Sequence, residues 1–169
     1  MGSMRLPRWA AACTALLAGC AGYYEGRGLV AGRSSAAEVE ALMGPSAYER
    51  AGPGGERTVF YSRQPYGRRI FAARIGADGR LLALEQTLTE ENIAKLEPNR
   101  TRRDEVLGLL GPPYGVTWFA RQQREVWEYK TYGLPEPFKV LYVQLSPDGV
   151  VREVYSMDDP EQRRPTLDN

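Results

Sequence analysis

The stretch SSAAEVEALMGP (residues 34–45) recurs in modified form as TRRDEVLGLLGP (residues 101–112), 67 residues further along the chain. Each stretch opens on Ser or Thr, and we expect Ser34 or Ser35, and Thr101, to be helix N-caps, because their oxygens accept a hydrogen bond from a free N–H of the first turn. Each stretch closes on Gly-Pro, where glycine tolerates positive φ and proline cannot continue a helix. The sequence therefore predicts two equivalent short helices.

One face of each predicted helix is apolar. The residues recur at i, i+3 and i+4, which places them together, and they are Val39, Leu42, Met43 in the first helix and Val106, Leu109, Leu110 in the second. Acidic residues three positions after the caps, Glu38 and Asp104, fit a capping box. Helices this short need a sheet to bury their apolar faces.

Runs of β-branched and aromatic residues after each helix predict that sheet. The expected strands are residues 57–62, 70–75 and 81–86 in the first copy, and 125–132, 140–145 and 150–155 in the second. Asp78-Gly79 and Asp148-Gly149 are hairpin dipeptides between the last two strands of each copy. A further short helix capped by Thr89 is expected at residues 89–96, and glycines weaken its counterpart before Leu29.

The fold predicted from this pattern is α+β, with two tandem repeats of one or two short helices on a three- to four-stranded antiparallel sheet. The first repeat spans residues 29–88 and the second 89–157, with residues 158–169 as a flexible tail. The pairs Leu29 with Leu96 and Phe60 with Trp127 keep the offset of 67.

The N-terminus has the parts of an export signal over residues 1–19: basic Arg5 and Arg8, an apolar run over residues 9–17, and small residues before a cleavage point. Residues 1–3 read as a cloning remnant. The alternative is a transmembrane anchor, but the run is nine residues long where a spanning helix needs about 20.

Leu17-Ala18-Gly19-Cys20 matches the lipobox of bacterial lipoproteins: a branched apolar residue, two small residues and a cysteine. The small residues let a peptidase approach the backbone, and the Cys20 thiol can carry a thioether-linked diacylglycerol. Several acyl chains hold a protein stably where a single chain does not. The residue after Cys20 is Ala21, and an Asp there would signal inner-membrane retention. We therefore expect a lipidated cysteine and short linker over residues 20–28, and an outer-membrane, periplasm-facing lipoprotein.

Composition limits the chemistry of the folded part. The chain has no His, and its two cysteines, Cys13 and Cys20, lie in the leader and at its end. These counts exclude histidine-dependent catalysis and thiolate zinc sites from the mature domain. Loss of Arg5 and Arg8 leaves 20 basic against 21 acidic residues, which is no nucleic-acid footprint. The sequence predicts no enzyme activity, no metal and no cofactor.

The motifs together resemble the BamE (SmpA/OmlA) lipoprotein family. They are the lipobox, Thr101, Glu105-Val106, Leu109-Leu110-Gly111-Pro112-Pro113, Val126-Trp127-Glu128-Tyr129 and Asp148-Gly149. The first copy matches more loosely, with Met43, Ser46 and Phe60 at variant positions. A doubled unit is also similar to the tandem-repeat architecture of the β-lactamase inhibitor protein, a likeness of fold alone.

The resemblance implies an accessory role in folding and inserting β-barrel proteins at the outer membrane, with a barrel-assembly subunit as partner and phosphatidylglycerol as a lipid contact. This chain departs from the family in its two repeats and in the short linker after Cys20. The alternative is a protein inhibitor or envelope-stress binding protein that uses the concave face between the repeats, and a simple tether is a third reading.

Several side-chain groups are candidates for contact. Arg100, Arg102 and Arg103 could meet a partner or lipid phosphates, or form a solvated face at the helix start. The strand aromatics Trp127, Tyr129, Tyr142 and Tyr155 could form a binding face, and core packing is the favoured reading. The pairs Glu90-Glu91 and Asp158-Asp159 suggest acid–base chemistry, but adjacent side chains point apart and no nucleophile is near.

Overall fold

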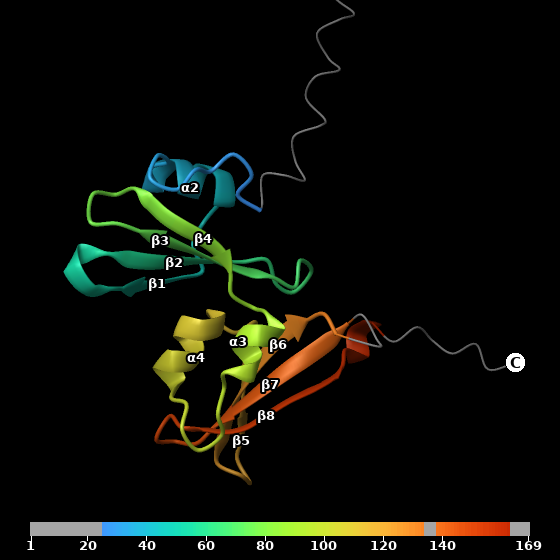
Figure 1. Cartoon of the computed structure of the whole chain (residues 1–169). Coiled ribbons are helices and arrows are strands. Elements are labelled where there is room, and N and C mark those ends of the chain that lie inside the picture. Colours follow the sequence, from blue (N-terminus) through green and yellow to red (C-terminus); the bar gives the residue numbers. More distant parts are fainter. Residues whose placement is uncertain (1–24, 134–137, 163–169) are drawn as a thin grey trace, which may run out of the picture.

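The computed structural model describes residues 25–133 and 138–162, and they form an α+β fold with two four-stranded antiparallel sheets (Figure 1). The first sheet has the order β1 (Tyr48–Ala51), β2 (Arg57–Ser62), β3 (Ile70–Ile75), β4 (Leu81–Gln86). The second has the order β5 (Gly115–Phe119), β6 (Arg124–Thr131), β7 (Lys139–Leu145), β8 (Val151–Asp158). The helices are α2 (Ala36–Met43), α3 (Glu90–Ala94) and α4 (Arg103–Leu110), with short 3-10 turns η1 (Pro53–Gly55) and η2 (Pro160–Gln162).

The three predicted helices and all six predicted strands are present, and β1 and β5 are two further strands that were not predicted. The strands that were missed are the first of each sheet, and their side chains are largely exposed. An edge strand that buries little carries a weak alternating pattern, so local sequence did not reveal either one.

The N-cap of α2 is Ser35, one of the two residues predicted, whereas the N-cap of α4 lies one residue after the predicted Thr101. Ser35 caps α2, where its Oγ accepts from the Glu38 N–H at 3.2 Å and its own N–H donates to Glu38 at 2.7 Å. The equivalent cap of α4 is Arg102, whose N–H donates to Glu105 at 2.6 Å. An arginine side chain cannot accept a hydrogen bond, so α4 has half of a capping box and the expected role of Asp104 was wrong.

Ser34 and Thr101 instead close the turn that leads into each helix. Ser34 Oγ accepts from the Val30 N–H at 3.0 Å, and Thr101 Oγ1 accepts from the Glu97 N–H at 2.8 Å. Both residues are buried. The two halves of the chain therefore share a hydrogen-bonded turn before the helix.

The first sheet is buried on both faces. Val59, Tyr61 and Phe71 pack with Val39 and Met43 of α2 on one side. The opposite face contributes its own apolar side chains to a second core, whose members include Phe60, Ile70, Leu88, Val106, Leu110, Trp127 and Tyr129. This packing on two sides explains why three consecutive residues of β2 are buried. The second core contains residues of the first sheet, of α4 and of the second sheet.

The favoured core packing of Trp127 is confirmed, but its equivalence to Phe60 at the offset of 67 is wrong. Trp127 faces the helix side of its sheet with Tyr129, as Val59 does with Tyr61, whereas Phe60 points to the opposite face. Strands β5 and β6 pair in a register that differs by one residue from that of β1 and β2. The offset of 67 between the two halves therefore does not hold after the turn between β5 and β6. Leu42 and Leu109 are only partly buried, while Val39, Met43, Val106 and Leu110 are fully buried.

The ordered fold also extends past the predicted end of the second unit. Strand β8 runs to Asp158, Asp159 is buried and η2 follows. Residues 158–162 are thus part of the fold and not of a flexible tail, while residues 163–169 lie outside the described residues.

Two glycines at the ends of α2 and α4 provide a matched test of the junction. Gly44 has φ 79° and Gly111 has φ 87°, both with extended ψ, a region that is essentially restricted to glycine. A Cβ on Gly44 would meet nothing within 4 Å, whereas one on Gly111 would lie 2.7 Å from Ile70 Cγ2 and 2.9 Å from Phe60 Cδ1.

We predict that Gly44→Ala lowers the free energy of unfolding by about 1–3 kcal/mol through backbone strain. Gly111→Ala should cost a further amount of about 1–3 kcal/mol, because the methyl group overpacks the junction with the first sheet. Urea denaturation of the two variants measures the difference, and equal losses would show that the junction is not tightly packed.

Candidate functional site

The predicted lipidation site, Cys20 with Leu17, Ala18 and Gly19, lies outside the described residues. Glu25 is the first described residue, and its carboxylate pairs with Arg69, directly before β3 of the first sheet. Within the described ranges, no helix is long and apolar enough to cross a bilayer.

Arg103, predicted as a surface contact, is committed to an ion pair. Its guanidinium donates to both oxygens of Glu125 at 2.7 and 2.6 Å and lies over the Trp127 ring, 5.3 Å from its centroid. Trp127 Nε1 also donates to Glu125 at 2.6 Å. The hydrogen bonds from Arg103 hold the pKa of Glu125 below its usual value, although partial burial opposes this. Arg103 therefore fixes the start of α4 on the second sheet.

Arg100 and Arg102 are more available. Arg100 pairs with Glu97 at 2.6 Å, with both side chains largely exposed, and such pairs contribute little. Arg102 is exposed and has no ion pair within the described part of the chain. The structure thus separates the three predicted arginines into one structural residue and two surface residues.

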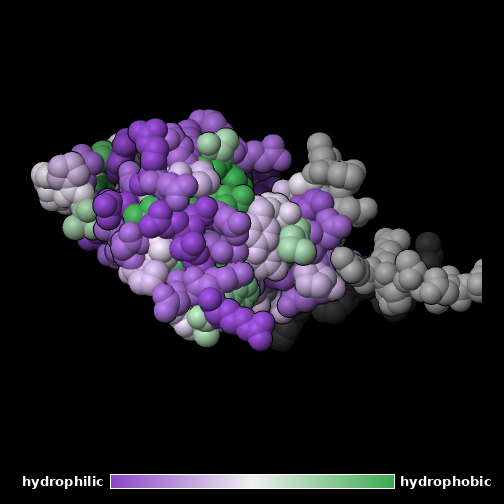
Figure 2. Space-filling view, turned by 90° about the horizontal axis from the view of Figure 1, so that it is seen from below, coloured by the Kyte–Doolittle hydropathy of each residue, from purple (hydrophilic) through white to green (hydrophobic). Residues whose placement is uncertain are grey.

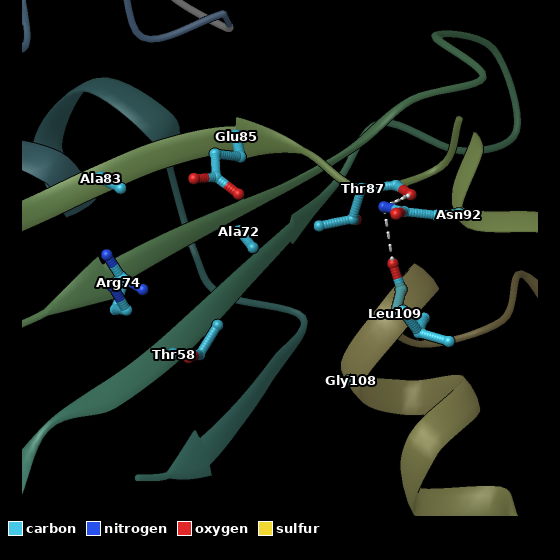
Figure 3. Close-up of a pocket in the computed structure, with 9 residues that line it drawn as sticks. All are labelled: Thr58, Ala72, Arg74, Ala83, Glu85, Thr87, Asn92, Gly108 and Leu109. Carbon is cyan, nitrogen blue, oxygen red and sulfur yellow. Dashed lines mark hydrogen bonds between the residues drawn. The ribbon is translucent and has the colours of Figure 1, made fainter. Parts of the chain in front are cut away.

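A groove of about 280 Å³ lies between the first sheet and the helices of the C-terminal half (Figure 3). Its sheet wall is made of small side chains, Thr58, Ala72 and Ala83, which leave space below the strands. Gly108 on α4 adds no side chain, and Arg50 crosses above it to donate to the Asp104 carbonyl at 3.3 Å. The groove results from small residues on both facing surfaces.

Polar atoms at the closed end of the groove hold the two sides together. Thr87 Oγ1 lies 3.2 Å from the carbonyl oxygen of Ile70 and 3.0 Å from that of Leu110, so its single O–H is shared between the two acceptors. Asn92 Nδ2 donates to the carbonyls of Thr87 at 2.9 Å and Leu109 at 3.2 Å (Figure 3). These amide and hydroxyl groups are already used in binding α3 and α4 to the first sheet.

The open end of the groove presents the charged pair Arg74 and Glu85 from neighbouring strands (Figure 3). Its volume is at the lower limit for small-molecule sites, which are about 300–1,000 Å³. The described residues contain no cluster of three or more His, Cys, Asp or Glu side chains that could hold a metal. The groove is suited to receiving one side chain of a protein partner.

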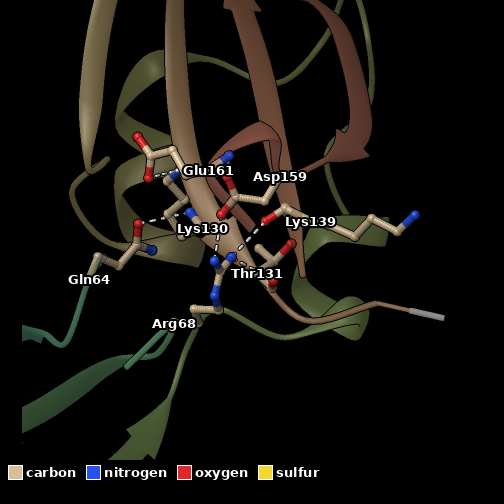
Figure 4. A network of polar contacts seen from close by, with 7 residues as sticks. All are labelled: Gln64, Arg68, Lys130, Thr131, Lys139, Asp159 and Glu161. Atoms are coloured by element: carbon tan, nitrogen blue, oxygen red, sulfur yellow. Dashed lines mark hydrogen bonds and ion pairs between the residues drawn. The ribbon is translucent and has the colours of Figure 1, made fainter. Parts of the chain in front are cut away.

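A buried ionic network lies at another part of the junction (Figure 4). Arg68, in the loop between β2 and β3, donates to Asp159 at 2.5 Å and to the carbonyls of Thr131 and Lys139 at 3.3 and 3.2 Å. Lys130 donates to Asp159 at 2.9 Å and to Glu161 at 2.9 Å. The Asp159 side chain is fully buried, and the network connects the loop between β2 and β3 to β6, to β7 and to the segment after β8.

Opposing effects set the protonation of Asp159. Burial alone would raise the pKa of its carboxyl, but the hydrogen bonds from Arg68 and Lys130 outweigh burial and hold the pKa below its usual value. Gln64 joins the network by accepting from the Lys130 backbone N–H at 2.9 Å. The Asp159 carboxyl group is therefore charged at neutral pH, and the network has a structural role.

Sequence reasoning missed this network. Asp159 was considered with Asp158 as an acid–base pair, but the two are in different settings: Asp158 is exposed and pairs with Lys139. Arg68 and Asp159 are 91 residues apart, and no local pattern connects them. The adjacent charged residues in a segment predicted to be a tail were the only local signal.

We predict that Asp159→Asn lowers the free energy of unfolding at pH 7 by about 3–5 kcal/mol, because it leaves buried Arg68 without an anionic partner and buried Lys130 with only the exposed Glu161. The neighbouring Asp158→Asn, an exposed pair, should cost less than about 1 kcal/mol. Chemical denaturation of both variants measures the contrast.

The pH dependence follows from the lowered pKa of Asp159. Its stabilisation is complete above the unfolded-state pKa of about 3.9 and is lost as pH falls through the lower folded-state value. The gap between the native chain and Asp159→Asn should therefore shrink below about pH 4, and a constant gap would contradict a charged Asp159.

No protein-family model matches the chain, and no curated protein matches its sequence. Among solved structures, YjgB from Bacillus subtilis subsp. subtilis str. 168, a DUF4309 family protein, is similar at 16% identity and a TM-score of 0.31. That similarity covers 82% of this chain and 91% of YjgB. A TM-score at this level supports no inference about function, and the resemblance to the BamE family stays a prediction from the motifs.

Proposed function

We propose that this chain is an outer-membrane lipoprotein, anchored by acyl chains on Cys20, whose folded part is a non-enzymatic binding module that assists β-barrel assembly. The observation that carries the proposal is the lipobox Leu17-Ala18-Gly19-Cys20 behind a basic and apolar leader. The BamE-like motifs of the second half add the expected partner, a barrel-assembly subunit.

The anchor would lie close to the folded part. Glu25 is five residues after Cys20, and an extended chain of that length spans at most about 18 Å. The end of the molecule that carries α2 would then lie beside the membrane, with α4 and the second sheet extending away from it (Figure 1).

We further propose that the two halves are copies of one unit. Supporting this, Ala36 N–H donates to Gly79 O and Arg103 N–H to Gly149 O, both at 2.8 Å, at offsets of 67 and 70. The turns closed by Ser34 and Thr101 have the same offset of 67. A duplicated unit accounts for these equivalent contacts in both halves.

The groove and the exposed arginines support binding over catalysis. Thr87 and Asn92 are engaged within the fold, and Arg74 with Glu85 remains for a partner's polar side chain. Arg100 and Arg102 add positive charge at the start of α4. The second candidate function is inhibition of an enzyme whose loop enters the groove, and the groove volume is its support.

We predict that Cys20→Ser leaves the precursor uncleaved and without acyl chains, because a serine hydroxyl cannot form the thioether. Cells fed labelled palmitate should label the native chain and the Cys13→Ser control, whose cysteine precedes the lipobox. Equal labelling of Cys20→Ser and the native chain would overturn the lipoprotein assignment.

A second prediction concerns partner capture. Reversing Arg100 and Arg102 to Glu should weaken recovery of barrel-assembly subunits from detergent-solubilised envelopes by up to about tenfold, since exposed pairs contribute about 0.2–1 kcal/mol each. Arg103 is left unchanged because it holds Glu125. The matched control is Arg33→Glu, 67 residues before Arg100 and also exposed.

The effect of reversal should be larger at low salt, because exposed charges are screened over about 8 Å at physiological ionic strength. Capture that is insensitive to both salt and charge reversal would show that these arginines are a solvated face. Failure of the native chain to capture any such subunit would contradict the proposed role in barrel assembly.

A further inference from the structure

Strand β5 differs from the other edge strands of the two described sheets. The edges are β1 (YERA), β4 (LLALEQ), β5 (GVTWF) and β8 (VREVYSMD). Charged side chains on edge strands discourage pairing with other chains, and β5 is the one of these four that carries none. Its free side therefore presents backbone N–H and C=O groups without a charged side chain in the strand.

The side chains of β5 add an exposed apolar row. Val116 is 57% exposed and Trp118 is 54% exposed. Val116 pairs with Trp127 of β6, and Trp118 pairs with Glu125. Paired residues point to the same side of a sheet, so Val116 and Trp118 lie on the side that packs against α4. At the offset of 67 the first half has Glu49 and Ala51, so the apolar row is a property of the second half alone.

The distal end of β5 is basic. Phe119 lies opposite Arg124 in the β5–β6 pair, and Arg121 follows in the turn. In the part of the chain that the structure describes, neither arginine forms an ion pair. Viewed from below, this end of the molecule is largely hydrophilic, with small hydrophobic areas between polar side chains (Figure 2).

We propose that β5 accepts an extended segment of another envelope protein as an added strand. The segment would carry apolar residues at alternate positions to pack on Val116 and Trp118, with an acidic residue at the end near Arg121 and Arg124. Main-chain hydrogen bonds supply affinity in such strand addition, and the alternate side chains supply specificity. A strand of an unfolded β-barrel protein has this alternation.

Two other occupants fit the geometry less well. The turn after β5 lies at the end of the second sheet that is away from the first sheet (Figure 1). Glu25, five residues after Cys20, pairs with Arg69 of the first half, so a membrane that held Cys20 would lie nearer the first half. A second copy would pair antiparallel across a two-fold axis, which places the two first sheets at opposite ends. Two Cys20 anchors could not then share one membrane.

The kind of partner rests on the proposed function, whereas the strand site itself can be tested without a membrane. The probe is a synthetic peptide of about ten residues, the length of one barrel strand, with valine and threonine alternating and aspartate at each end. Hydrogen exchange of the purified full chain should slow at residues 115–119 when this peptide is added.

Matched controls separate the contributions. A peptide with its valines consecutive, and one with lysine in place of each aspartate, should bind about tenfold more weakly. Val116→Lys and Trp118→Lys should abolish the slowed exchange, while Ser156→Lys, on the exposed β8 edge, should retain it. Thermal melting confirms that each variant is folded.

The proposal is overturned if exchange at residues 115–119 is unaffected by the alternating peptide, or if the consecutive-valine peptide acts equally. Slowing that rises with protein concentration without peptide would identify a second copy as the occupant. Slowing by phosphatidylethanolamine–phosphatidylglycerol vesicles would identify a membrane. A failed palmitate experiment changes none of these results, so the two proposals fail independently.

Discussion

The first sheet has to bury both of its faces, and the rest of the structure depends on that requirement. Helix α2 covers one face, but Phe60 and Ile70 on the other would be exposed without α4 and the second sheet. Close approach at this junction is possible because Gly111 has no Cβ where Phe60 and Ile70 pack. The hydrophobic contact joins the halves, but apolar contacts alone are non-directional.

Orientation at the junction comes from polar groups. Arg68 reaches Asp159 and two backbone carbonyls of the second half, and Thr87 with Asn92 links β4 and α3 to the carbonyls at the end of α4. A buried charge network contributes little net stability but is costly to break. In this protein the charge network fixes how the two sheets lie relative to each other. The groove lies where the small side chains on the facing surfaces do not fill the space between them.

The same architecture gives its two halves different surfaces. Both faces of the first sheet are buried, and its edge strand β1 carries charged residues. The second sheet has an uncharged edge at β5, with exposed apolar side chains and arginines beside it. If Cys20 anchors the chain, the first half stays near the membrane and the second presents this edge to the periplasm. Such a division suits a tethered module that holds an extended client.

Local sequence was sufficient for much of the fold. The Gly-Pro pairs predicted where α2 and α4 end, and the Asp-Gly dipeptides predicted the hairpins, because these residues restrict backbone angles within a few positions. The capping position lies at Arg102 and not at Thr101, since the Thr101 hydroxyl accepts a local hydrogen bond from the Glu97 N–H in the preceding turn. The leader and lipobox are likewise patterns of adjacent residues, but they lie outside the described residues and stay a prediction.

Contacts between residues far apart in sequence were decided only by the tertiary structure. The pairing of Arg68 with Asp159 and the groove beside Gly108 depend on how the first sheet lies against the C-terminal half. Arg103 was predicted as a surface contact and is a partner of Glu125, because α4 packs beside β6 of the second sheet. Local patterns specify backbone angles and the face of an element, whereas the burial of a charge depends on which distant segments surround it.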